Sequence, residues 1–269
     1  MPGFRKRRDT KNEKKIYQYG TGILALLLVL ICIFPFVFVL AGSFLKDGTL
    51  SFKAYYDVFL ASPQYLTRFW KSLGIGICIA AGQAVVSALA GYGFAKCRFP
   101  GKNVIYFCLM ILMILPLQVT LVPNYIMLDK LHLLGTEKSL ILPGIFLPLG
   151  TFLMTQCFKS VSDEVIDQAK VDGCNLLEMI VRIAVPMSRG ALVCVGLLSF
   201  LDAWNMVEQP IAYLKEFAQY PLSVALAYVS PEQPVRQFVC CILVLLPPLA
   251  LFSCFNKELV EGIVFGEEK

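Results

Sequence analysis

The chain has 269 residues, of which 57% are hydrophobic and only 16% are charged, and its mean hydropathy is +0.69. Soluble domains carry about a quarter charged residues, so this composition argues against a water-soluble globular protein and indicates lipid as the main solvent. The net charge of +5 does not indicate nucleic-acid binding, because the charges gather in short runs between long apolar stretches.

Residues 1–16 form a basic segment that we expect to be cytoplasmic. A basic run directly before an apolar helix is typical of an anchor that faces anionic lipid. The apolar stretch that follows is too long for the core of a signal peptide, so it is expected to remain as a spanning helix. The basic residues of the segment are Arg5, Lys6, Arg7, Arg8, Lys11, Lys14 and Lys15.

Six stretches of the chain are long enough to cross the hydrocarbon core, which takes about 20 apolar residues of helix. Prolines interrupt the third stretch, and they are tolerated because neighbouring helices can satisfy the freed backbone groups. The predicted fold class is an all-α polytopic membrane protein, with a single transmembrane domain over residues 17–269. The predicted spans are 17–44, 72–95, 104–128, 139–158, 186–213 and 238–255.

Six spans place both termini on the same side of the membrane, and the basic residues indicate which side. With the N-terminus inside, sixteen of the 24 Lys and Arg residues fall in cytoplasmic segments, as the positive-inside rule requires. We therefore expect a multi-pass protein of the bacterial inner membrane with cytoplasmic N- and C-termini. The eight basic residues left outside are Lys46, Lys53, Arg68, Lys71, Lys130, Lys138, Lys215 and Arg236.

Residues 159–185, between the fourth and fifth spans, are too many for a plain connector and have a helical pattern. Ser162 can cap a helix whose first turn is acidic, which complements the helix dipole. Gly173 suits the end of that helix, because glycine adopts a positive φ without strain. Asn175 and Glu178 then form a capping-box pattern for a second helix start. The loop is thus predicted to be a short helix, a glycine turn and a second helix.

Three apolar residues of the first predicted helix, Val165, Ile166 and Ala169, share one face. One interpretation is a helix that lies on the lipid headgroups with this face in the membrane. Against it, the acidic residues of the same helix are unfavourable next to anionic lipid. A short helix that is both acidic and apolar better suits a groove on another protein.

The run Asp-Gln-Ala-Lys-Val-Asp-Gly-Cys at residues 167–174, followed after eleven intervening residues by Pro186, resembles the EAA loop of ABC importer permeases. Asp167 stands at the glutamate of that motif, Gln168 and Ala169 at its two alanines, and Gly173 at its glycine. Two residues depart from the pattern, because Asp replaces Glu and Gln replaces the first Ala. Both replacements keep the charge sign or the helical tendency.

Other segments are similar to the maltose-type carbohydrate permeases among these importers, and together they cover about residues 54–266. They occur in the same order along the chain as in that group, which makes the resemblance specific. They are Gly91–Lys96 with Arg98–Gly101, Pro116 with Gln118–Thr120 and Pro123, Leu133–Thr136, Trp204–Asn205 with Pro210, and Glu261–Gly262. One departure is Met206, which stands where an Asp usually follows the Asn.

The resemblance implies a transport subunit that is not itself an enzyme, in a complex embedded in membrane lipid. Its implied partners are a second homologous permease, two ATP-binding cassette subunits and an extracellular or periplasmic solute-binding protein. The loop helix would be the coupling helix, whose apolar face enters a groove on the ATPase while Asp167 meets a basic side chain there. The implied ATPase-coupling residues are Val165, Ile166, Asp167, Gln168, Ala169, Asp172 and Gly173.

No cofactor is expected to bind this chain. The sequence contains no Walker A pattern, so ATP and its magnesium ion are expected in the partner subunit. No metal-ligand cluster is apparent either, and the single histidine, His132, is expected to be a solvated residue of an external turn.

Polar side chains within membrane spans are costly and often functional. Asp202 and Asn205 share a face of the fifth span, and Trp204 beside them offers a stacking surface for a sugar ring. With Gln118, they are the predicted substrate-pathway residues. The alternative for all of them, and for Gln83 and Gln156, is hydrogen bonding between helices.

Three other classes of function compete with this interpretation. An ion-coupled secondary transporter would have ionisable residues at mid-membrane and often paired repeats, whereas only Asp202 fits and no repeat is visible. A polytopic membrane enzyme would need convergent nucleophiles, acids or metal ligands at one face. An ABC permease for a non-carbohydrate solute is the third alternative, and the match at Trp204–Asn205 favours carbohydrate.

Overall fold

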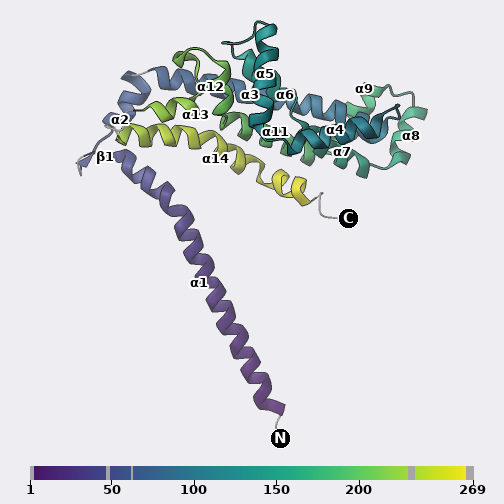
Figure 1. Ribbon diagram of the computed structural model, residues 1–269. Helices are drawn as coiled ribbons and strands as arrows, with labels where there is room; N and C mark the ends of the chain where they lie inside the picture. Colours follow the sequence, from purple (N-terminus) through teal and green to yellow (C-terminus); the bar gives the residue numbers. More distant parts are fainter. Residues whose placement is uncertain (1–2, 47–48, 62, 230–233, 265–269) are drawn as a thin grey trace. The chain divides into compact units, whose positions relative to one another are not determined.

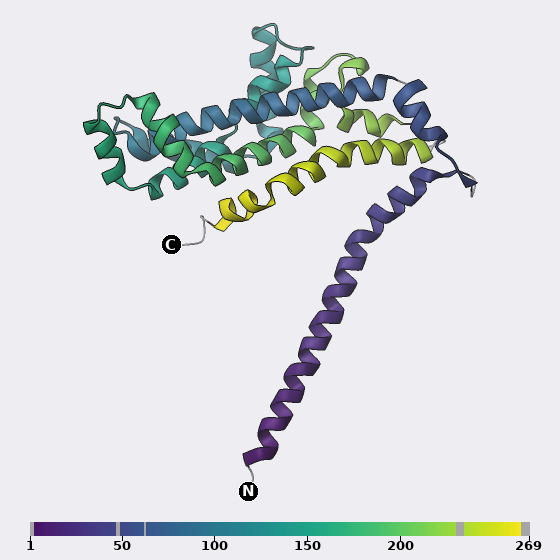
Figure 2. The same ribbon diagram turned by 180° about the vertical axis from the view of Figure 1, so that it is seen from behind.

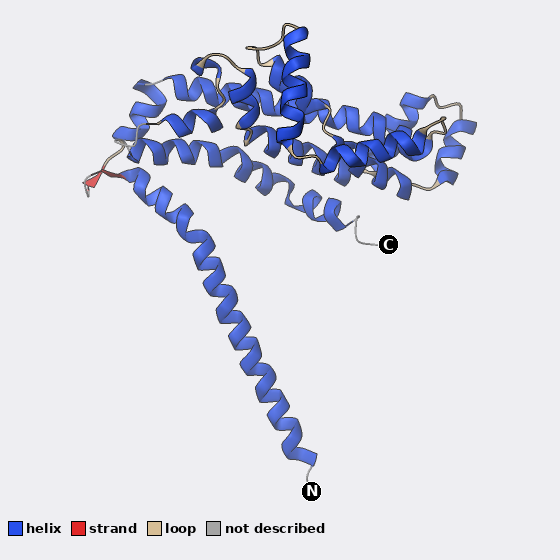
Figure 3. Cartoon of the chain, in the orientation of Figure 1, coloured by secondary structure: helices blue, strands red, loops and turns tan. Residues whose placement is uncertain are grey.

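The computed structural model describes residues 3–46, 49–61, 63–229 and 234–264, and helices dominate this part of the chain (Figure 3). The other regular structure there is a short antiparallel ribbon of two strands, β1 (Leu45–Lys46) and β2 (Thr49–Leu50). An all-α fold was predicted, and this ribbon is a minor addition to it. By their internal contacts the residues form two compact units, 1–61 with 230–242 and 62–229 with 243–269.

The first unit contains α1 (Gly3–Phe44), the ribbon, α2 (Lys53–Tyr56), the π-helical turn η1 (Asp57–Ala61) and the start of α14 (Pro234–Val264). Phe38 and Phe238 meet edge to face at 5.7 Å between ring centroids. Arg236 of α14 lies 3.6 Å from the Asp57 carboxylate. Between Gly20 and Phe44 the apolar side chains of α1 are largely exposed, as expected of a surface that faces lipid or another subunit.

The second unit is built around α3 (Pro63–Lys96), which runs along it in both views of the ribbon (Figures 1 and 2). It packs mainly against α7 (Pro148–Ser160) and α11 (Arg189–Trp204), and also against α6 (Lys138–Ile145). A Cβ atom added at Gly91 would lie 2.7 Å from the Met154 Cβ, so α3 and α7 approach too closely there for any larger residue. Small residues at such contacts are typical of helix packing within membranes.

The third predicted span is not one straight helix. Residues 102–130 form α4 (Lys102–Ile114) and α5 (Leu117–Lys130), which are bent by 110° at the break between them. Pro116 disfavours a helical conformation at the residue before it, and Leu115 is accordingly extended with ψ 128°. The predicted span 104–128, which prolines interrupt, is thus a bent pair of helices.

The fifth predicted span, 186–213, is also broken. Its longest helix is α11, and the helical segment Leu176–Met187 before it is bent by 88° relative to α11. That segment comprises α9 (Leu176–Glu178), the π-helical η2 (Met179–Ala184) and α10 (Val185–Met187). After α11 the chain breaks again before α12 (Glu208–Tyr213). The main helix of this span thus begins at Arg189, three residues beyond the predicted entry at 186, and ends at Trp204.

The remaining predicted spans are recovered with different bounds. Four helical stretches are each long and apolar enough to cross a membrane, and each bent pair can supply one more, which gives up to six in the described residues. The third of the four contains both α6 and α7. After α12, the chain forms η3 (Phe217–Gln219), α13 (Leu222–Ala225) and η4 (Leu226–Tyr228). The four stretches are Gly20–Phe44, Gln64–Lys96, Lys138–Ser160 and Pro234–Asn256.

Candidate functional site

The predicted loop helix is present as α8 (Asp163–Val171), at the same end of the second unit as α9 (Figure 1). The Ser162 hydroxyl accepts a hydrogen bond from the Glu164 amide at 3.2 Å, which satisfies one of the free donors of the first turn. Gly173 ends the helix with φ +82°, a conformation that favours glycine. The predicted cap and glycine turn are both confirmed.

The second helix start is also present. The Asn175 side-chain oxygen accepts from the Glu178 amide at 2.9 Å, and the Glu178 carboxylate accepts from the Asn175 amide at 3.0 Å. This reciprocal capping box fixes the direction in which the chain leaves the glycine turn. The whole segment from α8 to α9 is thus set by local hydrogen bonds that the sequence predicts.

The apolar face of α8 is used inside the chain. Ile166 is only 3% exposed and Ala169 only 5%, and both belong to the hydrophobic core that contains Phe158 and Ile180. Val165 beside them is half-buried. Side chains that already pack against the bundle are not free to enter a groove on another protein. The expectation that Ile166 and Ala169 supply the apolar contact with the ATPase is therefore corrected.

A different surface of this segment is free. Val171 is 88% exposed at the end of α8, and Leu176 and Leu177 are more than half exposed just beyond the turn. We call these three residues, together with the exposed polar residues Asp167, Gln168 and Asp172, the outer face. Exposed leucine and valine side chains grouped at a turn are typical of a contact surface. They were not singled out from the sequence, because no periodic pattern distinguishes them.

Asp167, the residue at the glutamate position of the motif, is paired within its own helix. Its carboxylate accepts a hydrogen bond from the Lys170 ammonium at 2.7 Å, and both side chains are exposed. This bond raises the pKa of Lys170 above its usual value. An exposed pair three residues apart contributes little to stability, so Asp167 can exchange Lys170 for another cation.

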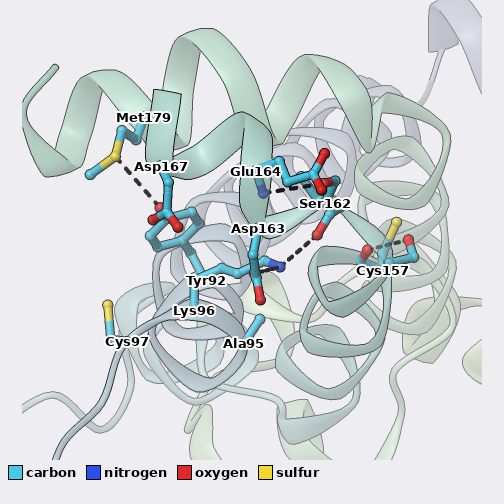
Figure 4. Close-up of polar contacts among 12 residues, drawn as sticks. Tyr92, Ala95, Lys96, Cys97, Cys157, Ser162, Asp163, Glu164, Asp167 and Met179 are labelled. Atoms are coloured by element: carbon cyan, nitrogen blue, oxygen red, sulfur yellow. Dashed lines mark hydrogen bonds and ion pairs between the residues drawn. The ribbon is translucent and has the colours of Figure 1, made fainter. Parts of the chain in front are cut away.

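Lys96, the last residue of α3, joins the bundle to the start of α8 (Figure 4). Its ammonium donates to the Val161 carbonyl and to the Asp163 carboxylate, each at 2.6 Å, and its side chain is only 9% exposed. Hydrogen bonding and the charge of Lys96 lower the pKa of Asp163, which lies at the helix surface. One turn earlier, the Tyr92 hydroxyl donates to the Met179 sulfur at 3.9 Å. From the sequence, Lys96 was noticed only as part of a resemblance.

Trp204 does not present a stacking surface for a sugar. It is 2% exposed, lies parallel to Phe200 at 5.7 Å, and donates its indole N–H to the Val244 carbonyl at 3.0 Å. Every one of these contacts holds the ring inside the protein. The predicted pathway role of Trp204 is corrected to a core role, in which α11 is joined to α14.

The other predicted pathway residues have separate environments. The Asn205 amide donates to the Leu201 carbonyl at 2.9 Å and so caps its own helix. Gln118 donates to both oxygens of Glu208 at 3.0 and 3.2 Å, which links α5 to α12. Asp202 lines a cavity of about 80 Å³. Apart from Asp202, the polar side chains of this cavity are Thr120, Asn124, Gln209 and Tyr213.

Gln83 and Gln156, for which hydrogen bonding between helices was the alternative to a pathway role, both form such bonds. The buried Gln83 amide of α3 donates to the Leu147 carbonyl at 2.7 Å, at the break between α6 and α7. Gln156 of α7 donates to the Tyr106 hydroxyl of α4 at 3.1 Å. Both side chains therefore connect helices, as the interpretation of hydrogen bonding between helices predicts.

The fold and this end segment together define a class: a polytopic helical membrane protein with a capped helix between two of its spans. Residues 83–257 match the family described as "binding-protein-dependent transport system inner membrane component". Because the match covers more than half of the chain, the chain belongs to that family. It is the permease subunit of a binding-protein-dependent ABC transporter, and ATP hydrolysis takes place in separate subunits.

Relatives of known name match over most of their length. The arabinooligosaccharides transport system permease protein AraQ of Bacillus subtilis (strain 168) is 26% identical over 94% of this chain and 96% of that protein. The sn-glycerol-3-phosphate transport system permease protein UgpE of Yersinia enterocolitica is 26% identical over 77% of this chain and 75% of that protein.

A crystal structure of a bacterial ABC transporter involved in the import of the acidic polysaccharide alginate contains a chain with the same fold. It matches with a TM-score of 0.78 and 19% sequence identity over 91% of this chain and 97% of that chain. The likeness concerns the fold alone.

Proposed function

We propose that this chain forms one half of the translocation pathway of an ATP-driven importer for a carbohydrate. The other half would be a second homologous permease, and two ATP-binding cassette subunits with ATP and magnesium would drive the cycle. A solute-binding protein outside the membrane would deliver the cargo. Carbohydrate is favoured because AraQ is named for arabinooligosaccharides and another relative for polygalacturonan and rhamnogalacturonan.

The orientation belongs to the proposal. The α8 end of the second unit would face the cytoplasm, together with both termini. The positive-inside rule supports this, because at that end Arg98 lies in the loop between α3 and α4, Lys102 begins α4, and the chain begins with a basic segment. The ATPase would then meet the outer face from the cytosol.

The exposed outer face is the observation that supports docking of an ATPase subunit on this chain. Val171, Leu176 and Leu177 are apolar, exposed and held in place by two capped helix starts on either side of Gly173. Burial of about 100 Å² of apolar surface is worth roughly 2–3 kcal/mol, which is enough to seat a helix that is already ordered. Asp167 and Asp172 would supply charged contacts to basic side chains in the groove.

The test of this surface is Val171→Asp, with Leu131→Asp as the matched control. Leu131 is also an exposed apolar residue, but it follows α5 and lies outside the outer face. The chain is co-expressed with its partner permease, ATPase and binding protein, and both ATPase co-purification and ATP-dependent uptake into membrane vesicles are measured. Val171→Asp should lower both by about tenfold or more, whereas Leu131→Asp should leave both unchanged. Normal co-purification and uptake with Val171→Asp would overturn the proposal that the outer face binds the ATPase.

Cargo and energy source are tested in the same vesicles. Uptake of a neutral oligosaccharide should require ATP and should persist when ion gradients are collapsed. Uptake that survives ATP depletion but stops with the gradients would identify an ion-coupled transporter. Strict preference for a phosphorylated or other non-carbohydrate solute would overturn the cargo assignment and leave the ABC assignment intact.

A further inference from the structure

We propose that Lys96 is a positioning residue for energy coupling, whose ammonium fixes the start of α8 to the end of α3. The inference rests on the proposed docking of the α8 segment on an ATPase. It adds the point at which motion of that segment would enter the membrane bundle.

The two acceptors of Lys96 lie on the two sides of a short connection. Val161 follows the end of α7 and Asp163 is the first residue of α8, and the chain between them is extended, with ψ 129° at Val161 and 135° at Ser162. Extended residues have no intrahelical hydrogen bonds to fix their angle. Val161 packs in the hydrophobic core and Ser162 caps α8, and Lys96 adds to these contacts a bridge from α3 that binds both sides of the connection.

Burial indicates that this arrangement is specific. An ammonium removed from water is costly unless its donors are satisfied, and the Lys96 side chain is only 9% exposed. Two of its donors make charge-assisted bonds at 2.6 Å, which is short for such bonds. An apolar side chain would fill the same space without this cost, so packing alone does not explain a lysine here.

The other contacts of α8 with the bundle are of a different kind. Ile166 and Ala169 pack against an apolar core, and apolar burial is non-directional, so it allows a helix to slide or rotate. The bonds of Lys96 are directional and hold one end of α8. Tyr92, one turn earlier on α3, contacts Met179 on the far side of the glycine turn. The last two turns of α3 thus engage the segment both before and after Gly173.

The experiment compares Lys96→Met with Lys102→Met in the complete reconstituted transporter. Lys102 is the matched control, because its ammonium donates to the Cys97 carbonyl at 2.9 Å near the same end of α3 but to no atom of α8. Uptake and ATP hydrolysis are measured together on equal amounts of assembled complex. Lys96→Met should lower solute imported per ATP by about tenfold, while hydrolysis continues and Lys96→Arg restores part of the ratio. Lys102→Met should leave the ratio unchanged.

The outcomes are distinguishable. An unchanged ratio with Lys96→Met, in a complex whose wild type imports with ATP, overturns this inference alone. A wild type that shows no ATP-dependent import overturns the proposed function and this inference with it. If Lys96→Met does not assemble, Asp163→Asn decides, because it keeps the lysine and its bond to the Val161 carbonyl. Asp163→Asn should lower the solute imported per ATP by about threefold. An unchanged value would reject the positioning role of Lys96.

Discussion

Trp204 is buried at the end of α11, where its ring stacks on Phe200 and contacts α14. From the sequence, Trp204 beside Asp202 and Asn205 was predicted to offer a stacking surface for a sugar, whereas its ring fills the core and its N–H donates to a backbone carbonyl of α14. Buried tryptophans usually find such a partner for the indole N–H. The sequence identifies the need for a partner, but it does not distinguish a ligand from the protein backbone.

The first prediction concerns this core role. Trp204→Ala should destabilise the solubilised chain by about 3–5 kcal/mol, because it leaves a cavity and an unpaired carbonyl. The measurement is thermal unfolding in detergent. Trp70→Ala is the control, since Trp70 is the other of the two tryptophans and is 61% exposed. Equal melting temperatures for the two variants would contradict the core assignment.

The second prediction separates Asp202 from Asn205. Asp202→Asn should lower uptake by about tenfold without loss of ATPase assembly, because Asp202 lines the cavity and the change removes its acidic group. Asn205→Ala should have little effect on uptake, since that amide binds its own helix. Uptake by the two variants is compared in membrane vesicles. If Asn205→Ala is the more damaging change, the pathway lies elsewhere.

The third prediction uses the pKa of Asp163. The neighbouring Lys96 lowers this pKa in the folded state, so the pair contributes to stability above the ordinary carboxyl pKa of about 3.9. That contribution is lost as the pH falls through the lower folded value. A side-chain carboxyl NMR titration should give a midpoint below 3.9 in the wild type and a higher midpoint in Lys96→Met. Identical midpoints would exclude the pairing in solution.

At the scale of elements, the α8 segment was well described by local rules. Its cap at Ser162, its turn at Gly173 and the capping box that follows were all predicted from residues close in sequence. The face of the helix that remains free was not predicted. Hydrophobicity indicates that Ile166 and Ala169 leave water, but it does not indicate whether the receiving surface belongs to this chain or to another.

The fourth prediction concerns the turn. Gly173→Val should abolish coupled import, because a β-branched residue is strained at φ +82° and the turn would reorient the outer face. Gly173→Asn should retain much of the activity, since asparagine tolerates this region of backbone. The readout is solute imported per ATP in the reconstituted complex. Equal activity of both variants would mean that the turn angle does not matter.

At the scale of the whole molecule, the proposed orientation predicts which residues can be reached from each side of the membrane. We expect a cysteine introduced at Asp172 to react with an impermeant thiol reagent only from the cytoplasmic side. One introduced at Lys215, in the exposed chain after α12, should react only from outside. The background is the same chain with its own exposed cysteines replaced. Reaction of both positions from one side would reject the six-span topology.

By itself, the sequence determined the membrane class, the approximate position of each span and the local caps and turn of the α8 segment. These features depend on the length of apolar runs and on residues a few positions apart, so they can be predicted without knowledge of the fold. Only the tertiary structure decided the 110° bend at Pro116, the burial of Trp204, the hydrogen bonds of Lys96 to Val161 and Asp163, and the identity of the outer face. Each of these depends on which distant segment lies opposite, and a side chain's affinity for an apolar or polar partner does not specify where along the chain that partner is found.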